Sequence, residues 1–256
     1  MPSRMPVKDR KEPAQRRTAA AIPVSGRLVD DLKKREGGQT LATAAYRRLR
    51  DDILTGVLAP NSKLLTRDLQ DRYQLSVGPL REALSRLHAE DLVSCSDHRG
   101  FWVSPISIQE IRDLTRVRML LEEAALRDSI ASGSDEWEAA VVTSFHLLCR
   151  LTERNAQMSS VTLPEWEVSH DAFHRALIGA ASSRLLLRLR ASLTQTVRRY
   201  RTFALVDASE RDHLGEHRAI YEATIAHDAE RAVRLLTEHY ELTTRIIIAK
   251  FNEANV

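Results

Sequence analysis

Apolar side chains in the stretch from residue 40 to residue 104 recur first at helical and then at strand spacing. Leucine, alanine and isoleucine side chains recur every four residues from Leu41 to Ile53. This spacing predicts a helix that Thr40 caps and that ends at Gly56. The segment LAPNSKLL predicts a turn, Thr66 is expected to cap a short second helix, and Ser76 precedes a third. The segments LVSC and FWVSPI, on either side of a polar turn that contains a glycine, predict a hairpin. Three helices followed by a hairpin is the element order of a winged helix-turn-helix.

The third predicted helix has a two-sided pattern that suits DNA binding. Its leucines and Ala83 form the face expected to be buried, whereas Arg81, Ser85 and Arg86 point outward. The first turn of such a helix can enter the major groove while the hairpin lies against the neighbouring backbone. Small domains with this element order also mediate protein contacts, so the pattern alone leaves both functions open.

Residues 105–256 carry helical periodicity throughout. Ser107 and Glu110 form a capping-box pattern that opens a helix to about residue 131, and GSDEW opens a second to about residue 154. Pro164 lies in the first turn of a third helix, and three more are predicted over residues 183–205, 209–226 and 228–252. Six amphipathic helices with short connectors predict a bundle whose interior can hold a ligand cavity. The predicted fold is mainly α, with a winged helix-turn-helix before an all-helical bundle.

The composition agrees with a helical fold, and the charge is unevenly distributed. Only 9 glycines and 8 prolines occur among 256 residues, and 43% of the residues are hydrophobic. The net charge is only +3, but ten Lys or Arg face five acidic residues within positions 1–40. We expect residues 1–39 to be a disordered basic arm, either a solvated tail or a source of non-specific attraction to phosphates. The sequence has no signal-peptide pattern, no apolar run of membrane-spanning length and two widely spaced cysteines, so the cytoplasm is expected.

Longer motifs in both halves resemble a known family. The first half resembles the DNA-binding domain of GntR-family bacterial transcription regulators through PLREAL, the following L..E.LV, a wing glycine and an aromatic residue. The second half resembles the FCD ligand-binding domain of the FadR subfamily through IRDLTRVRMLLEEAAL, HDAFHRALIGAA and HRAIYEATIAHDAERAVRLLTEH. Within that subfamily, SVGPLREALSRL, GSDEWEA, HDAFH and RRYR are most similar to glutarate-responsive, carbon-starvation-induced repressors. The resemblance implies that residues 40–104 bind operator DNA and that residues 105–256 bind an effector and dimerise.

The resemblance also implies which residues contact DNA, with one departure. The family's usual recognition helix opens with a Ser-Arg-Thr-Pro type of sequence that places an arginine against bases, whereas this chain has Ser76-Val77-Gly78-Pro79. The operator is therefore expected to differ from the commonest family consensus, with Arg67 and Arg81 as the main remaining contacts. The complete set of candidates is Arg67, Ser76, Gly78, Pro79, Arg81, Arg86, His98, Arg99 and Gly100.

A second departure concerns a metal site. Many FCD domains hold a divalent metal through an Asp and a His one helical turn apart and two later histidines, and this chain has His170 at the usual Asp position. Asp171, one residue along, points about 100° away around the helix. For the effector carboxylate the resemblance implies Arg118, and Arg199 and Arg201 in RRYR are additional candidates. Because neutral imidazoles suit softer ions, zinc or nickel is expected on the implied ligands His170, His174, His217 and His239.

Three functions remain in view at the level of sequence. The first is a homodimeric, cytoplasmic repressor that binds an inverted repeat and releases it when a small carboxylate, such as glutarate or a related diacid, enters the bundle. The second is a metal-dependent hydrolase, although Asp171 is a poor substitute for the glutamate base of helical zinc proteases and no G-x-S-x-G motif occurs. The third is a helical interaction module that binds no small ligand.

Overall fold

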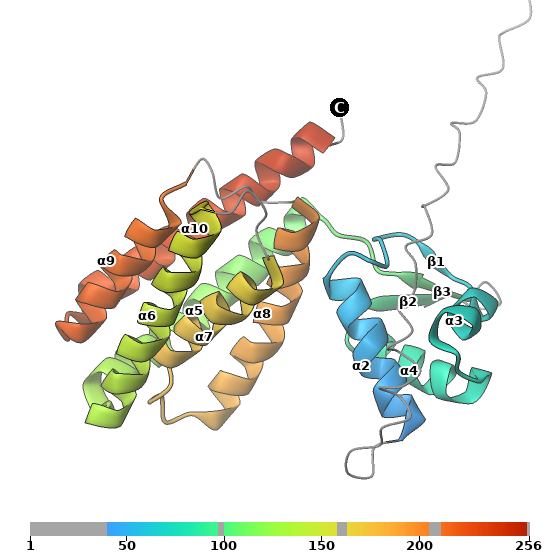
Figure 1. Cartoon of the computed structure of the whole chain (residues 1–256), viewed down its shortest axis with the longest axis horizontal. Helices are drawn as coiled ribbons and strands as arrows, with labels where there is room; N and C mark the ends of the chain where they lie inside the picture. The colour runs from blue at the N-terminus through green and yellow to red at the C-terminus, as the bar shows by residue number, and fades with distance from the viewer. Residues whose placement is uncertain (1–39, 97–99, 158–162, 205–210, 255–256) are drawn as a thin grey trace, which may run out of the picture.

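The computed structural model describes residues 40–96, 100–157, 163–204 and 211–254, which form a small α/β unit followed by a helical bundle (Figure 1). The first unit consists of α2 (Leu41–Leu54), β1 (Lys63–Leu64), α3 (Thr66–Tyr73), α4 (Val77–Ala89), β2 (Val93–Ser96) and β3 (Gly100–Val103). The second consists of α5 (Ile108–Ser132), α6 (Asp135–Gln157), α7 (Leu163–Leu177), α8 (Arg184–Ala204), α9 (His213–Ile225) and α10 (Ala229–Ala254). The predicted mainly α fold is confirmed. The arm predicted over residues 1–39 lies outside the described residues, as do His98 and Arg99.

Apolar residues from the three helices of the first unit form one core that holds α4 in place. Leu49 on α2 and Leu84 on α4 are completely buried where these two helices pack together. Tyr73, at the end of α3, is also buried and donates its hydroxyl to the buried carboxylate of Asp52 at 2.6 Å. This bond joins α3 to α2, so the two helices that pack against α4 are held together and fix the position of its first turn.

The small sheet contains one strand more than the sequence predicts. β1 lies within LAPNSKLL, for which only a turn is predicted, so that prediction is wrong at these two residues. The strand order is β1-β3-β2 with antiparallel neighbours, and Lys63 lies opposite Trp102. Leu64 is buried while Lys63 is exposed. Two residues are too few to give the alternating pattern by which a strand is recognised in a sequence.

The predicted caps of α2 and α5 are present, but the predicted cap of α3 is wrong. Thr40 Oγ1 accepts a hydrogen bond from the backbone N–H three residues on at 3.2 Å, and Ser107 Oγ does the same at 3.0 Å. Thr66 is instead the first residue of α3, and Leu65 occupies the cap position. A Thr at the first helical position is still compatible with the helix, so the shift moves the boundary by one residue.

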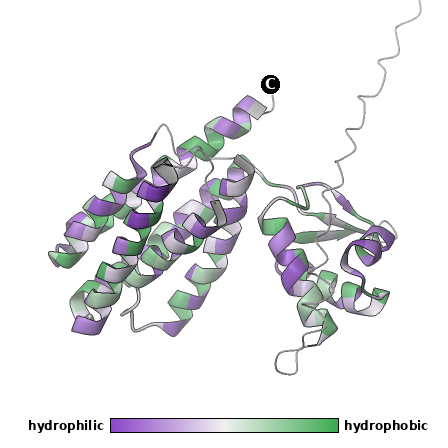
Figure 2. Ribbon diagram, viewed as in Figure 1, coloured by the Kyte–Doolittle hydropathy of each residue, from purple (hydrophilic) through white to green (hydrophobic). Residues whose placement is uncertain are grey.

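The bundle helices are two-sided, as the mixed hydropathy along each ribbon in Figure 2 shows. α6 packs on α7, α10 packs on α5 and α9, and α5 packs on α8 around an apolar core that includes Leu126, Phe173 and Leu177. None of the helices in the described ranges is long and apolar enough to cross a membrane.

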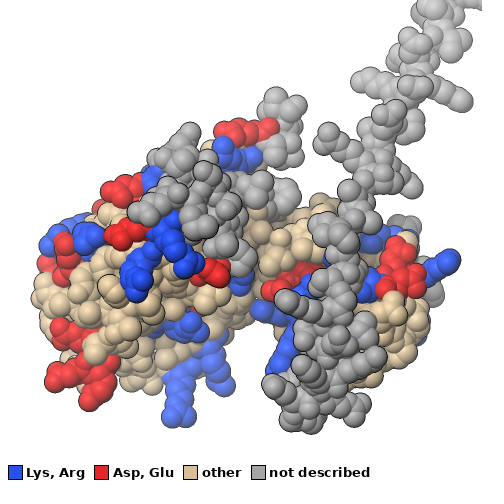
Figure 3. Space-filling model, viewed as in Figure 1, with Lys and Arg blue, Asp and Glu red and all other residues tan. Residues whose placement is uncertain are grey.

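Many ionisable side chains are nevertheless inside the bundle. On the face visible in Figure 3, basic and acidic side chains of the bundle are interspersed, without one large patch of a single sign. Ionisable groups removed from water need partners or a ligand, so their gathering marks a candidate site. The buried ones in the bundle include Arg118, Glu122, His170, His174, Arg190, Arg199, His217 and His239.

Candidate metal centre and nucleic-acid interface

Four buried histidines meet in the interior of the bundle. α7 contributes His170 and His174, which lie one helical turn apart, α9 contributes His217, and α10 contributes His239. A tight turn at His227, where φ is 55°, returns the chain so that α10 packs beside α9. One nitrogen of each ring lies within 4.8 Å of those of the other rings. The structure thus brings together the four histidines that the family resemblance implies as ligands.

Two of the separations between ring nitrogens match those of ligands on one tetrahedral ion. His174 Nε2 lies 3.2 Å from His170 Nε2 and 3.3 Å from His217 Nε2. Tetrahedral nitrogen ligands at about 2.0–2.1 Å from a metal are separated from one another by roughly 3.3 Å. The donor set therefore fits a divalent ion that prefers imidazole, such as zinc or nickel.

Burial keeps these imidazoles neutral. It is the largest cause that lowers the pKa of His170, His174 and His217 well below the ordinary value, and the neighbouring imidazoles lower it further. Burial also lowers the pKa of His239, to about 4. A neutral imidazole has a lone pair on one of its two nitrogens, and that nitrogen can bind a metal at neutral pH.

The outer nitrogens, Nδ1, of the four histidines have two kinds of partner. Three of them face an oxygen: the backbone oxygen of His213 for His217 (2.5 Å), the Tyr240 hydroxyl for His174 (3.0 Å) and a Glu216 carboxylate oxygen for His239 (2.8 Å). The fourth, Nδ1 of His170, faces Nη1 of Arg201 at 3.4 Å. Such outer partners fix the orientation and the tautomer of metal-binding histidines.

Two buried arginines form an ion-pair network beside the cluster. Arg118 pairs with Glu122 at 3.0 Å and donates to the Tyr240 hydroxyl at 3.0 Å. Arg190 contacts the same glutamate at 2.8 Å and Asp171 at 3.3 Å, so the aspartate of HDAFH is paired with an arginine of α8. Burial raises the pKa of the Glu122 carboxyl, but the two guanidinium groups outweigh it and hold that pKa below its usual value. Glu122 therefore stays ionised although it is buried.

Arg190 and Glu122 are absent from the sequence-based candidates. No motif marks them, and arginines in LRLRASL are typical of a solvated helix face. One signal was available: Arg190, Thr194 and Val197 recur at four- and three-residue spacing on the buried side of α8, which continues to Arg201. An arginine in register with an apolar stripe indicates a buried ion pair.

The two candidate arginines of RRYR point to different places. Nη1 of Arg201 faces His170, and its Nη2 pairs with a glutamate of α7. Arg199 donates instead to the backbone oxygen of Ser104, in the connector between β3 and α5. Of the three arginines expected to bind an effector, the structure places Arg118 and Arg201 beside the histidines and turns Arg199 to the connector.

Most of the described candidates for DNA contact surround the exposed beginning of α4. Ser76 occupies the cap position without a side-chain cap bond, and Gly78 has open space where a Cβ would lie. Pro79 lies in the same first turn, Arg81 follows in the second, and Arg67 lies on α3; both arginines are exposed. The open space at Gly78 lets a nucleic-acid backbone or base edge approach the helix closely.

Two other candidates are tied to the fold. Arg86 lies with its guanidinium 4.1 Å from the centre of the Tyr46 ring and donates to the Thr43 hydroxyl at 3.3 Å, so it also joins α4 to α2. Gly100 begins β3 with a φ of 99°, a conformation that other residues rarely adopt. This glycine therefore sets the backbone of the wing.

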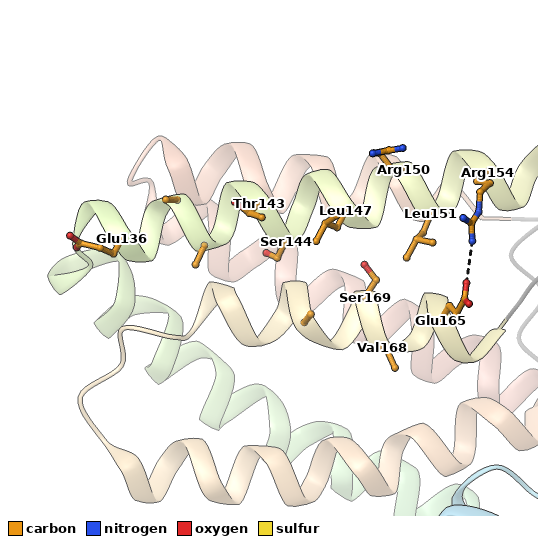
Figure 4. Close-up of a pocket in the computed structure, with 13 residues that line it drawn as sticks. Glu136, Thr143, Ser144, Leu147, Arg150, Leu151, Arg154, Glu165, Val168 and Ser169 are labelled. Atoms are coloured by element: carbon orange, nitrogen blue, oxygen red, sulfur yellow. Dashed lines mark hydrogen bonds and ion pairs between the residues drawn. The ribbon is translucent and has the colours of Figure 1, made fainter. Parts of the chain in front are cut away.

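A groove on the outside of the bundle is distinct from the histidine site. It has a volume of about 830 Å³ and runs between α6 and α7, with Leu147 and Val168 in its lining and an Arg154–Glu165 ion pair at one end (Figure 4). His170 and the other histidines do not line it. The groove is mostly apolar, so it does not offer the converging charges that a carboxylate needs.

Comparison with known proteins matches both units. Residues 41–103 match the model of bacterial regulatory proteins of the gntR family, and residues 113–242 match the FCD domain. The chain is 40% identical over 210 residues to the "Uncharacterized HTH-type transcriptional regulator BphR" of Paraburkholderia xenovorans. That alignment covers 82% of this chain and 86% of that protein. It is 39% identical over 200 residues to the "HTH-type transcriptional repressor GlaR" of Escherichia coli, with 76% and 90% covered. The solved structure of E. coli McbR/YncC aligns with a TM-score of 0.69 at 19% identity over 84% of this chain and 100% of that one.

Proposed function

Because the chain belongs to the gntR family of bacterial transcription regulators and carries an FCD domain, we propose that it is a cytoplasmic repressor whose DNA binding is relieved by a small carboxylate. Members of this family are regulators and not enzymes, so the hydrolase alternative is set aside. We assign residues 40–104 to operator binding and residues 105–256 to effector binding and dimerisation. A relative that is 39% identical is named as a repressor, which supports repression rather than activation.

The balance of charges around the histidine cluster is the observation that supports a dicarboxylate as the effector. Among the described residues, the guanidinium groups around the cluster pair with carboxylates: Arg118 and Arg190 with Glu122 and Asp171, Arg201 with Glu167, and Arg211 with Glu216. Imidazoles contribute no negative charge, so a divalent ion held by the histidines would add two uncompensated charges to a buried site. A dicarboxylate such as glutarate or a related diacid balances them. The ion would supply a coordination position for one carboxylate, and a nearby guanidinium would bind the other.

An apolar face supports a homodimer as the functional unit. Val117 and Leu120 on α5 are 46% and 63% exposed, and Leu185 and Leu189 on α8 are 57% and 49% exposed. The two helices pack side by side, and a depression of about 410 Å³ that Val117 and Leu193 line lies between them. Neighbouring exposed leucines on two packed helices suit a self-complementary interface around a twofold axis.

Helix α8 offers a route from the histidine site to the DNA-binding unit. Arg201 contacts the cluster, while its neighbours hold the connector: Arg199 donates to Ser104, and the Tyr200 hydroxyl accepts from the backbone N–H of Ser107 at 3.1 Å. Helix α2 also packs against α8. A ligand that moves Arg201 would therefore act on the residues that fix the first turn of α5. When an effector binds two domain arrangements with different affinities, the free energy of DNA binding typically changes by about 1–3 kcal/mol.

The proposal is tested by DNA binding in the presence of diacids. The full chain, loaded with zinc or nickel, is titrated onto its own upstream region and onto a scrambled duplex at physiological salt, with fluorescence anisotropy as the readout. We expect specific binding that glutarate or a neighbouring diacid weakens about 5–150-fold, whereas the monoacid valerate has little effect. Absence of specific binding would overturn the repressor, and a diacid-independent affinity would overturn the effector class.

A further inference from the structure

His170 differs from the other three histidines in what its outer nitrogen contacts. Nδ1 of His217 and of His239 lies against a backbone carbonyl oxygen and a carboxylate oxygen, which can only accept a hydrogen bond from Nδ1–H, and Nδ1 of His174 lies against the Tyr240 hydroxyl, which can accept as well as donate. His217 and His239 therefore carry their proton on Nδ1 and direct the lone pair of Nε2 into the cluster, and the Tyr240 hydroxyl is able to accept from the same tautomer of His174. His239 also has Arg211 Nη2 at 3.1 Å, but the two hydrogens of that nitrogen have acceptors in a Glu216 carboxylate oxygen and the His239 backbone oxygen.

For His170 the tautomer is reversed. Its Nδ1 faces the guanidinium of Arg201, which has hydrogens to donate and no lone pair to accept with. A proton on Nδ1 would set two donors against each other, so Nδ1 accepts from Arg201. A neutral ring then carries its proton on Nε2, the atom that lies 3.2 Å from His174 Nε2. A protonated nitrogen has no lone pair for a metal.

The surroundings of His170 fix the plane of its ring. Trp166 stacks on it with ring centres 4.7 Å apart and planes inclined by 22°. The Trp166 indole is fixed in turn by its hydrogen bond to the Thr152 hydroxyl at 3.1 Å. Arg201 is held by its ion pair with Glu167, one turn before His170 on α7. These contacts fix the plane of the His170 ring and the guanidinium that lies beside it.

We propose that His174, His217 and His239 hold the metal and that His170 is an effector-binding residue, which donates its Nε2–H to the carboxylate of the diacid. Three protein ligands leave a tetrahedral ion one position for an exchangeable ligand, as binding of an effector requires. A donor beside that position attracts a carboxylate, where a fourth ligand would close the site. The assignment of the three metal ligands stands on the hydrogen bonds alone, whereas the effector role of His170 rests on the proposed function.

The test measures metal affinity and diacid affinity separately. Nickel and zinc dissociation constants are measured by competition with a chelator, and glutarate binding to the loaded protein by calorimetry, for His170→Leu, His170→Gln and His174→Gln. We expect His170→Leu to keep the metal affinity within about threefold and to weaken glutarate binding about tenfold, as loss of one hydrogen bond to a charged group predicts. His170→Gln keeps a donor and recovers part of the glutarate affinity. His174→Gln, the matched change of a ligand, weakens the metal by at least about 100-fold.

A spectroscopic readout decides the ligand count in the unaltered protein. X-ray absorption of the nickel-loaded wild-type chain is expected to show three imidazoles with oxygen in the remaining positions. Four imidazoles, or a metal affinity that falls as far in His170→Leu as in His174→Gln, would overturn the assignment. Three imidazoles without any glutarate binding would leave the ligand assignment standing and overturn both the proposed effector class and the role of His170. Absence of metal binding by the wild-type protein would overturn the metal site itself.

Discussion

The hydroxyl of Tyr200 accepts a hydrogen bond from the backbone N–H of Ser107 at 3.1 Å and donates to the carboxylate of Glu110, so α8 is fastened to the first turn of α5. These residues directly follow the connector from the DNA-binding unit. One turn of α8 therefore makes both kinds of contact. Arg201 contacts the histidine cluster, and the two residues before it, Arg199 and Tyr200, contact the connector and the first turn of α5.

Removal of the Tyr200 hydroxyl should weaken the response to effector more than it weakens effector binding. Tyr200→Phe keeps the ring in its buried position but loses both hydrogen bonds, each worth about 1 kcal/mol. We expect metal and diacid affinities within about twofold of wild type and a several-fold smaller effect of the diacid on DNA affinity. Tyr221→Phe is the control, because Tyr221 packs through its ring on Phe145 at 4.3 Å. An unchanged diacid response in Tyr200→Phe would exclude this route.

Metal binding should stabilise the folded chain. A ligand at a concentration 100 times its dissociation constant adds about 2.7 kcal/mol to the free energy of unfolding. For a chain of this size each kcal/mol corresponds to roughly 2–4 °C in Tm. We expect nickel to raise Tm by about 5–10 °C in a thermal melt and an excess of chelator to reverse the shift. His217→Gln should abolish the shift, and an equal shift in that variant would place the metal elsewhere.

The metal-free protein should lose stability as the pH falls below the ordinary histidine range. Burial lowers the pKa of His213 and His239 from 6.5 to about 4 in the folded chain. Between these values the unfolded chain binds protons that the folded chain does not, so the free energy of unfolding decreases with falling pH. Urea titrations at pH 7.5 and 5.0 measure the difference. His213→Gln should reduce the slope without removing a proposed ligand, and equal stability at both pH values would contradict the buried neutral form.

Charges placed on the exposed face of α5 and α8 should separate the dimer. Leu120→Glu and Leu189→Glu each put a carboxylate where we expect the same face of a second copy, and burial of unpaired charge is unfavourable. We expect light scattering after size exclusion to give the monomer mass for these variants and the dimer mass for wild type. Leu147→Glu is the matched control, since Leu147 is also half exposed but lies at the groove between α6 and α7. Dimers in both variants would move the interface elsewhere.

Sequence-specific DNA binding should depend on Arg81 and on the absence of a side chain at Gly78. Loss of a base contact costs about 1–3 kcal/mol and relaxes specificity, whereas loss of a phosphate contact weakens all duplexes alike. Arg81→Ala is therefore measured on the upstream region and on a scrambled duplex. Gly78→Ala adds a Cβ into open space, so the fold is expected to be kept, and a change in DNA affinity would show that DNA approaches the helix at this point.

The sequence predicted the fold better than the hydrogen bonds and ion pairs of the site. Periodicity and caps predict the helices, because each depends on residues within a few positions of one another, whereas β1 is too short for its pattern to be recognised. The gathering of the histidines follows from motif positions. The partners of their outer nitrogens do not, because Arg201 of α8 and Glu216 of α9 meet α7 and α10 only after the bundle has packed. Arg190 shows the same limit, since its partners Glu122 and Asp171 lie on two other helices.

An aspartate at position 170 should exchange effector binding for metal binding. His170→Asp replaces the proposed hydrogen-bond donor by a carboxylate that can ligate the ion and that Arg201 can pair with. The added negative charge also removes half of the positive charge that attracts a diacid. We expect the nickel affinity to rise by at least about tenfold, the glutarate affinity to fall by a similar factor, and DNA binding by the loaded protein to become insensitive to glutarate. His170→Asn, which adds no charge, separates the effect of charge from the loss of the imidazole. If both variants lowered the metal affinity, His170 would itself be a ligand, and the distinction drawn from the Arg201 hydrogen bond would fail.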